Sequence, residues 1–297
     1  MFLGTKAVRE TLSSKITQAL EEGLGSDELK ATFADWQANI NEGEGSRERA
    51  EKLTELLEVE KGDNELLNGI YDKKDFFVKR SQWIIGGDGW GYDIGYGGLD
   101  HVLASGEDVN VLILDTEVYS NTGGQSSKAT PAAAIAQFAA TGKRAKKKDI
   151  GMMAMSYGYV YVAQIALGAN PAQALKAIEE AESYNGPSLI IGYAPCELHG
   201  IAKGGMNHCQ DEMKKAVKAG YWNLFSFNPA LKAEGKNPFT LTSKEGDGSY
   251  QDFLNNEARY TRLVKPFPER AERLFAKSEE VANERYQHLL KLVDLYK

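Results

Sequence analysis

The composition is that of an acidic globular protein and argues against a nucleic-acid or membrane protein. The chain has 297 residues, of which 42% are hydrophobic and 26% charged, and its formal net charge is −7. Nucleic-acid binders usually carry a basic face, and no run here approaches the roughly 18 apolar residues of a membrane span. No apolar core follows Met1, so no signal peptide is expected. Only two cysteines, Cys196 and Cys209, occur, which favours a reducing, cytoplasmic setting without disulfides.

The first quarter of the chain predicts a helical arm. Apolar residues recur every four positions in its first segment, at Val8, Leu12, Ile16 and Leu20. Ser26 is a fair N-cap for a second helix, and the helical pattern resumes after a glycine-containing break at 43–46. Charged residues dominate, so residues 1–74 are predicted to be a helical arm or insertion of the main domain.

From Asp75 onward, short apolar runs alternate with helical patterns, which is typical of βαβ units and a parallel sheet. The predicted strands are Trp83–Ile85, Val109–Leu114, Ile150–Met155 and Ser188–Ile191. The predicted helices are Tyr92–Ser105, Pro131–Thr141, Val160–Leu167, Pro171–Glu182 and Gln210–Ala219. The fold class is therefore α/β, with a core at 75–225 and a C-terminal extension at 226–297. That extension ends in a long helix from about Pro268 to Leu295.

An acidic residue between glycines follows the first predicted strand. The stretch Gly86–Gly91 does not fit the dinucleotide fingerprint, because the sixth position counted from Gly87 is Tyr92. The carboxylate of Asp88 would repel a bare diphosphate, whereas Mg²⁺ binds both carboxylate and phosphate oxygens. The flanking glycines let backbone N–H groups approach the diphosphate closely. Asp88 is therefore predicted to be the metal ligand that carries a diphosphate.

A second metal ligand is expected where the next strand ends, because parallel strands place their carboxyl ends at one edge of the sheet. Thr116 stands there, at the start of a polar, glycine-rich loop. Asp115 is the rival ligand, although its position at the strand end could equally make it a cap.

Three long stretches resemble the C-terminal domain of the pyruvate:ferredoxin (flavodoxin) oxidoreductases, and the Gly-Asp-Gly turn with its second loop resembles the thiamine diphosphate motif. The stretches are Gly86–Val102, Asp115–Lys128 and Met153–Ala163. The similarity extends over nearly the whole chain, including the helical arm and the tail. It implies a parallel-sheet thiamine diphosphate-binding fold.

The resemblance also implies roles for individual residues. Mg²⁺ would be bound by the Asp88 carboxylate, the Thr116 hydroxyl and the Val118 carbonyl. Asn121 would lie over the thiazolium, with its amide placed to hydrogen-bond a developing oxyanion, although alone it could be a turn residue. The implied cofactor contacts are Gly87, Asp88, Gly89, Trp90, Thr116, Glu117, Val118, Tyr119, Ser120 and Asn121.

Residues outside the two loops receive separate interpretations. A lone cysteine is more often a small buried residue, but the resemblance implies that Cys196 supplies one thiolate to a [4Fe–4S] cluster, which needs four. Cys209 matches no ligand, and His199 is interpreted as a hydrogen-bonding loop residue. The basic run Lys143–Lys148 is interpreted as a solvated loop, with a docking patch for ferredoxin, flavodoxin or coenzyme A phosphates as the alternative.

The resemblance implies a part of an enzyme that oxidatively decarboxylates pyruvate, or a related 2-oxo acid, to CO₂ and acetyl-coenzyme A. Electrons would pass through iron–sulfur clusters to ferredoxin or flavodoxin. Thiamine diphosphate, Mg²⁺ and one [4Fe–4S] cluster are the implied cofactors. We expect the chain to need upstream domains or a partner chain, to be inactive alone, and to form a homodimer when complete. The alternatives are a subunit of a non-redox thiamine diphosphate enzyme and a fragment that serves only as a binding module.

Overall fold

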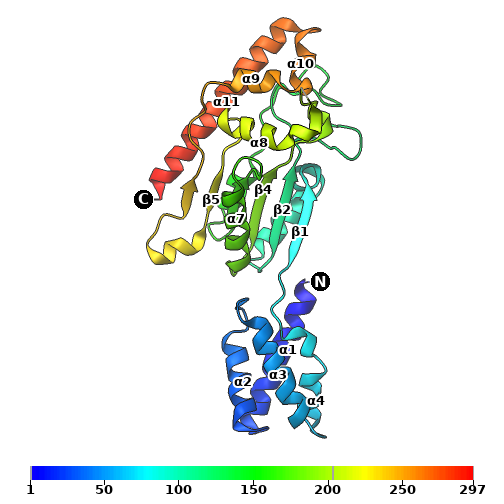
Figure 1. Cartoon of the computed structure of the whole chain (residues 1–297), viewed down its shortest axis with the longest axis vertical. Helices are drawn as coiled ribbons and strands as arrows, with labels where there is room; N and C mark the ends of the chain where they lie inside the picture. Colours follow the sequence, from blue (N-terminus) through cyan, green and yellow to red (C-terminus); the bar gives the residue numbers. More distant parts are fainter. Residues whose placement is uncertain (1, 203, 297) are drawn as a thin grey trace. The chain divides into compact units, whose positions relative to one another are not determined.

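The computed structural model describes residues 2–202 and 204–296 and divides the chain into two compact units, Met1–Gln82 and Trp83–Lys297 (Figure 1). Each unit buries its own hydrophobic core. Among the described residues, no helix combines the length and apolar character that a membrane crossing requires.

The first unit is a bundle of four helices. They are α1 (Phe2–Glu21), α2 (Asp27–Ala38), α3 (Ser46–Glu60) and α4 (Glu65–Tyr71), followed by a short 3₁₀ turn at Lys74–Phe76. Ser26 caps α2 by accepting a hydrogen bond from the Leu29 amide, as its sequence position predicts. Leu12 and Ile16 of the predicted stripe are fully buried in the bundle core. The guanidinium of Arg9 closes the bundle by donating to the carbonyls of residues 76–78.

The second unit is built on a six-stranded sheet in the order β1-β2-β4-β3-β5-β6. The strands are β1 (Trp83–Gly87), β2 (Asn110–Asp115), β3 (Tyr161–Ile165), β4 (Ser188–Tyr193), β5 (Phe225–Phe227) and β6 (Phe239–Leu241). The first four pair in parallel, and β5 and β6 extend the sheet in the antiparallel sense. The predicted α/β class with a largely parallel sheet is confirmed.

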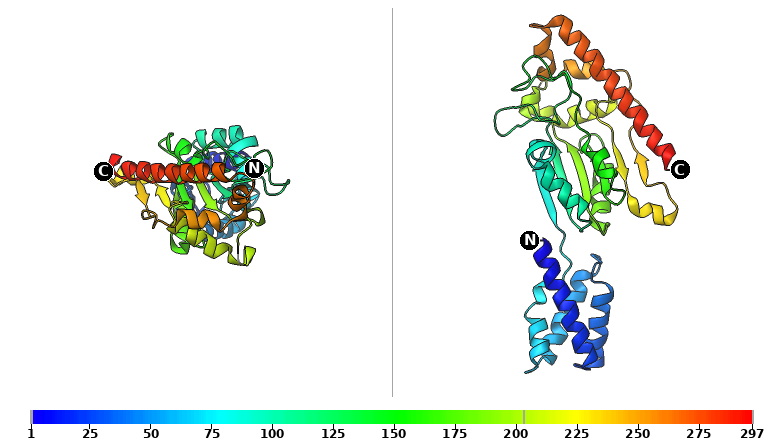
Figure 2. Two further views of the ribbon diagram at one scale, coloured as in Figure 1. Left: turned by 90° about the horizontal axis from the view of Figure 1, so that it is seen from above. Right: turned by 180° about the vertical axis from the view of Figure 1, so that it is seen from behind.

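Helices cover both faces of this sheet. α7 (Pro171–Ser183) packs its alanines against Tyr161 and Ile190 on one face. The other face packs against α5 (Tyr96–Ala104), α6 (Ile150–Met155) and the C-terminal helices. The latter are α8 (Cys209–Lys218), α9 (Tyr250–Asn255), α10 (Ala258–Val264) and α11 (Pro268–Leu295). Figure 2 shows the long α11 lying along the outside of the unit. Tyr296, the residue after α11, packs its ring against Phe227 of β5.

Two predicted elements have the opposite type of secondary structure. Ile150–Met155 was expected to be a strand but forms α6, because Asp149 caps the first turn by accepting a hydrogen bond from the Met152 amide. Val160–Leu167 was expected to be a helix but contains β3, whose residues are all buried. A strand buried on both faces reads as a continuous apolar run, which periodicity cannot distinguish from a buried helix.

The predicted helix at Pro131–Thr141 is also wrong, because this segment is an irregular loop. Its backbone amides bond outside the segment: Ala133 donates to the Lys143 carbonyl and Ile135 to the Arg259 carbonyl. Ala133 and Phe138 have positive φ angles, which no helix allows. The loop is therefore held by distant parts of the chain, and its local pattern does not report its structure.

β1 is an edge strand, and the face it shares with β2 is partly uncovered. Ile85 and Leu114 on this face are 62% and 45% exposed. An exposed edge beside apolar side chains is a surface that other chains can pair with.

Candidate functional site

The carboxyl ends of β1 and β2 bring the two predicted loops into direct contact. Gly87 pairs with Leu114 in the parallel register, so Asp88 and Thr116 emerge side by side. Asp88 is only 1% exposed. Its Oδ1 accepts hydrogen bonds from the Thr116 hydroxyl at 2.7 Å and the Thr116 amide at 3.2 Å, and its Oδ2 accepts one from Ser127 at 2.7 Å.

The three predicted metal ligands lie together. The Thr116 hydroxyl is 2.7 Å from Asp88 Oδ1 and 3.0 Å from the Val118 carbonyl oxygen. A carboxylate, a hydroxyl and a carbonyl are hard oxygen donors of the kind that Mg²⁺ binds, with diphosphate oxygens or water in the remaining positions. In the described part of the chain no cluster of three or more His, Cys, Asp or Glu side chains suits a metal. The Asp88 site would instead rely on a single carboxylate.

The residue between two of these ligands has an unusual backbone. Glu117 adopts a φ of 61°, in the left-handed region that non-glycine residues rarely occupy, and it is only 2% exposed. Its amide donates to Asp115 Oδ1 at 3.1 Å, and its carbonyl accepts from the Thr130 hydroxyl at 2.6 Å. Across this turn the Thr116 hydroxyl contacts both Asp88 Oδ1 and the Val118 carbonyl oxygen.

The side chain of Glu117 points into a buried ion cluster. Oε1 lies 2.9 Å from the Lys147 ammonium, and Oε2 lies 2.9 Å from the Arg259 guanidinium. The Tyr221 hydroxyl also donates to Oε2 at 2.5 Å. Burial opposes ionisation of Glu117, but the two cations outweigh it and lower its pKa to about 2. The carboxylate predicted to contact the cofactor is thus fully engaged inside the protein.

A second set of contacts links the ion cluster to the loop that follows β2, which is called the metal loop below. Arg259 also bonds Glu257 at 2.6 Å through its Nε, and the Glu257 carboxylate lies 3.5 Å from Nδ1 of His199. His199 is fully buried, and its Nε2 is 2.9 Å from the Thr116 carbonyl oxygen. His199 is therefore a hydrogen-bonding residue, as the sequence predicted, and its partner belongs to the loop beside Asp88.

The rival metal ligand is occupied elsewhere. Asp115 is fully buried, and its Oδ2 lies 2.7 Å from both the Lys147 ammonium and the Tyr92 hydroxyl. Burial raises the pKa of Asp115 to about 6, against the lowering effect of Lys147. Of the two candidates, only Thr116 contacts Asp88.

The basic run Lys143–Lys148 is an irregular segment, and its interpretation as a solvated loop fits residues 144–146, whereas Lys143, Lys147 and Lys148 make internal contacts. Lys147 pairs with two buried carboxylates, and Lys143 donates to the Ser127 carbonyl at 2.7 Å. Lys148 donates to the Tyr92 carbonyl at 3.2 Å. Burial lowers the pKa of Lys143 to about 8. Only three side chains at the middle of the run, residues 144–146, are exposed.

The buried charges around the site do not balance. Four carboxylates are at most 2% exposed: Asp88, Asp115, Glu117 and Glu257. Two cations, Lys147 and Arg259, are paired with three of them. With every group ionised the cluster carries an excess of negative charge. Burial raises the pKa of Asp88, which has no direct cationic partner among the described contacts, while Ser127 and Thr116 lower it by hydrogen bonding. A divalent cation at Asp88 would offset this excess.

The remaining predicted cofactor residues lie in the segments that follow β1 and β2. A Cβ at Gly87 would meet no atom within 4 Å, whereas a Cβ at Gly89 would lie 2.4 Å from the Tyr119 ring. Residues Gly89–Ile94 form a π-helical turn that half-buries Trp90; such turns occur frequently at functional sites. Ser120 is half-buried, and Asn121 is exposed on the loop. The space beside the Gly87 backbone, at the end of β1, is thus not filled by other described side chains.

Cys196 lies in the loop after β4, and both cysteines are free. Burial raises the pKa of the Cys196 thiol, while hydrogen bonds from the Leu198 and His199 amides lower it. Cys209 begins α8 and makes none of these contacts.

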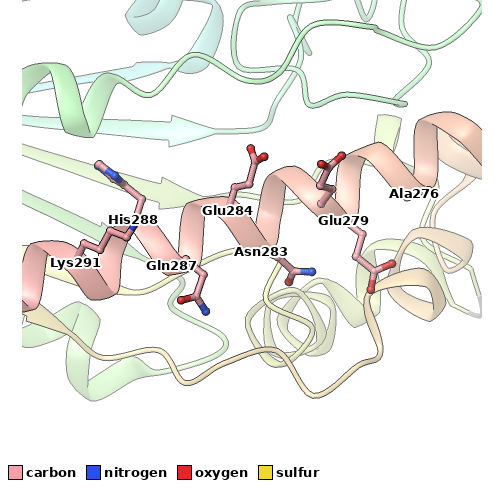
Figure 3. A pocket seen from close by; sticks show the side chains of 8 residues that line it. Ala276, Glu279, Asn283, Glu284, Gln287, His288 and Lys291 are labelled. Carbon is pink, nitrogen blue, oxygen red and sulfur yellow. The ribbon is translucent and has the colours of Figure 1, made fainter.

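Two cavities lie apart from the Asp88 carboxylate. One, of about 230 Å³, lies behind the metal loop and is lined by Glu117, Val118, His199 and Arg259 among others. The other lies along α11, where Glu279, Glu284 and His288 are on its wall (Figure 3). None of the predicted cofactor residues lines this second hollow.

Sequence reasoning missed the supports of the site. Lys147, Arg259, Glu257 and Tyr221 have no motif, and their partners are far away in the chain; Tyr221 and Glu117 are 104 residues apart. Ser127 belongs to the stretch Asp115–Lys128 that resembles the family, yet no sequence pattern identifies its hydroxyl as a partner of Asp88.

Comparison with known proteins gives consistent matches. Residues 75–191 match the family model of the thiamine pyrophosphate enzyme C-terminal TPP binding domain. The chain is 56% identical to a pyruvate-flavodoxin oxidoreductase of Klebsiella pneumoniae, over 98% of this chain and 25% of that protein. It is 54% identical to a pyruvate:ferredoxin oxidoreductase of Moorella thermoacetica, over 99% of this chain and 25% of that protein. A mitochondrial pyruvate dehydrogenase (NADP⁺) of Euglena gracilis is 46% identical over 96% of this chain and 16% of its own length. The chain therefore spans a quarter or less of these relatives.

Proposed function

Because the chain belongs with the C-terminal thiamine diphosphate-binding domain of the pyruvate:ferredoxin (flavodoxin) oxidoreductases, we propose that it binds the Mg²⁺-diphosphate end of that cofactor. The observation that carries this proposal is the convergence of three oxygen donors at the ends of β1 and β2. The Thr116 hydroxyl lies between the other two donors, 2.7 Å from Asp88 Oδ1 and 3.0 Å from the Val118 carbonyl oxygen.

The excess of buried negative charge supports a cation at this place. Asp88 is enclosed, yet no lysine or arginine pairs with it directly among the described ion pairs. Isolated buried carboxylates are costly unless they are paired or bind a metal. Mg²⁺ would meet that requirement and would hold the diphosphate beside Gly87, where the space is open.

Thiamine diphosphate supplies the carbon nucleophile and electron sink for decarboxylation of a 2-oxo acid, while the protein orients it. The Tyr119 ring, packed against Gly89, would fix the turn beside the diphosphate. Asn121, exposed at the loop tip, would donate its amide hydrogen bond to an oxygen of the substrate. Trp90 and Ser120 would border the same opening.

Cys196 is proposed to supply one of the four thiolates of a [4Fe–4S] cluster. The resemblance to the oxidoreductase family supports this role, and Cys196 is a free, half-buried thiol in the loop after β4, where a neighbouring cluster could reach it. The other three thiolates would come from a part of the enzyme outside this chain.

The complete enzyme is proposed to convert pyruvate and coenzyme A to acetyl-coenzyme A and CO₂, with ferredoxin or flavodoxin as electron acceptor. The names of the Klebsiella and Moorella relatives support this reaction class. Since the chain spans a quarter of their length, upstream domains or a partner chain would supply the rest of the active site. We propose a cytoplasmic, homodimeric assembly, with this chain inactive alone. The alternative is a non-redox thiamine diphosphate enzyme, and it would be indicated if Cys196 bound no iron–sulfur cluster.

Calorimetric titration of the chain with thiamine diphosphate and Mg²⁺ tests the proposal. Outer partners of metal ligands typically contribute 10–100-fold to metal affinity, so removing a ligand in Asp88→Asn should weaken binding at least about 100-fold. Asp100→Asn is the matched control, because that carboxylate, on α5, accepts a hydrogen bond from the Tyr157 hydroxyl and does not contact the site. Equal binding by Asp88→Asn and wild type, or no Mg²⁺-dependent binding by wild type, would refute the metal assignment.

A further inference from the structure

The C-terminal part of the second unit contacts the metal loop from the inside. Arg259, at the start of α10, is 5% exposed and bridges two buried carboxylates, Glu117 and Glu257, with its planar guanidinium. Tyr221, which precedes β5, donates a hydrogen bond to Glu117 Oε2, the oxygen that also pairs with the Arg259 guanidinium. No cofactor atom is needed to explain these contacts.

We propose that Arg259 and Tyr221 are positioning residues for the metal site: by clamping Glu117 they hold the left-handed turn that keeps the Thr116 hydroxyl beside Asp88 and the Val118 carbonyl beside that hydroxyl. This inference rests on the proposed function, since it assigns the supports of the same site. It also reassigns Glu117 from a cofactor contact to the anchor of the loop.

The conformation of Glu117 is the first step of the argument. A non-glycine residue in the left-handed region is strained, and such strain persists only where surrounding contacts over-determine it. All hydrogen-bonding groups of Glu117 are occupied: the amide by Asp115, the carbonyl by Thr130, and the carboxylate by Lys147, Arg259 and Tyr221.

The consequence for the ligands follows from chain connectivity. Thr116 and Val118 are the immediate neighbours of Glu117, so release of its turn moves the Thr116 hydroxyl and the Val118 carbonyl relative to Asp88. His199 adds a further restraint, because its Nε2 bonds the Thr116 carbonyl and its other nitrogen faces the Arg259 partner Glu257. The clamp and this restraint both depend on residues 257–259.

A positioning role and a purely electrostatic role of Arg259 predict opposite changes in metal affinity, so one measurement distinguishes them. Arg259→Gln removes a cation from a cluster that already has excess negative charge, so a purely electrostatic effect would tighten binding of a divalent cation. Loss of positioning would weaken it. Outer-shell supports of metal ligands contribute about 10–100-fold to affinity, so we expect Arg259→Gln to bind at least about 10-fold more weakly.

The experiment measures Mn²⁺ binding to the whole chain by electron paramagnetic resonance in the presence of thiamine diphosphate. Tyr221→Phe is the second variant, because it removes one hydrogen bond to Glu117 without leaving a buried charge unpaired, and it should weaken Mn²⁺ binding about threefold or more. Tyr250→Phe is its matched control: that hydroxyl is also buried among the C-terminal helices, but it bonds Ser278. Tyr250→Phe should lower stability without changing Mn²⁺ affinity.

The outcomes separate the two proposals. If wild type binds Mn²⁺ and Asp88→Asn does not, the metal site is supported. In that case, unchanged or tighter binding by Arg259→Gln would overturn the positioning role alone. Equal effects of Tyr221→Phe and Tyr250→Phe on Mn²⁺ affinity would overturn it as well. If Arg259→Gln does not fold, the Tyr221→Phe and Tyr250→Phe pair decides. Absence of Mn²⁺ binding by wild type overturns the proposed function, and the inference with it.

Discussion

Removing Lys147 should destabilise the second unit in a strongly pH-dependent way. Its ammonium lies 2.7 Å from Asp115 and 2.9 Å from Glu117, and both carboxylates are at most 2% exposed. In Lys147→Met, Glu117 keeps Arg259 and Tyr221, so the loss falls on Asp115. Removing one partner of a buried ion pair costs about 3–5 kcal/mol, which is the expected loss in the free energy of unfolding at pH 7.5.

The pH dependence follows from Asp115. Burial already raises its pKa to about 6 beside Lys147, and loss of the cation raises it further. The folded variant then binds this proton more tightly than the unfolded chain, so the penalty is full above the folded pKa and fades as the pH falls below it. Protonating a carboxyl at pH 5.5 costs about 2 kcal/mol from an unfolded pKa near 3.9, so the loss at that pH should be at most about 2 kcal/mol.

Urea unfolding of wild type and variant at the two pH values measures this. Lys148→Met is the control: its ammonium bonds the Tyr92 carbonyl and lies over the Tyr96 ring, so it should cost about 1 kcal/mol or less at either pH. The transition of the four-helix unit, Met1–Gln82, serves as an internal reference that should not move. Equal losses for the two variants, or a loss for Lys147→Met that grows toward pH 5.5, would refute the reasoning.

Two further predictions concern the cofactors. Gly89→Ala should lower the free energy of unfolding by about 1–3 kcal/mol in urea or thermal unfolding, because its Cβ would lie 2.4 Å from the Tyr119 ring. Gly87→Ala should leave stability nearly unchanged and weaken thiamine diphosphate binding in calorimetry, and the reverse pattern would contradict the placement of the diphosphate. In the reconstituted enzyme, Cys196→Ser should abolish or alter the electron paramagnetic resonance signal of one [4Fe–4S] cluster, and an unchanged spectrum would exclude Cys196 as a ligand.

Sequence reasoning located the two loops because local chemistry marks them. Asp88 lies between glycines after an apolar run, and Thr116 starts a polar loop after the next one, so their meeting at one sheet edge follows from parallel pairing. The clamp on Glu117 has no such mark. Lys147 lies in a run of basic residues that looks solvated, and Arg259 is an ordinary charged residue of a helical pattern. Long-range ion pairs leave no period in a sequence, so only the folded chain shows them.

The elements beyond the loops follow the same rule. β3 is buried on both faces, so its apolar run fits a helix as well as a strand. The loop at 131–141 begins with a proline that suits a helix, yet its amides bond to Lys143, Arg259 and Gly124. Where the backbone hydrogen bonds lie within one helix, as in α7 and α11, the sequence predicts the helix and its bounds closely.

The distance along the chain between Glu117 and its clamp has a consequence for synthesis. Tyr221 leaves the ribosome 104 residues after Glu117, and Arg259 later still. β1 and β2 can pair early, but the turn at Glu117 cannot reach its folded geometry until α10 has emerged. A nonsense mutation between α8 and α10 would therefore yield a chain that has both cofactor loops and all four parallel strands. In that chain the Glu117 carboxylate would lack its arginine and its turn would stay unfinished, and chaperones and proteases act on such incompletely folded chains.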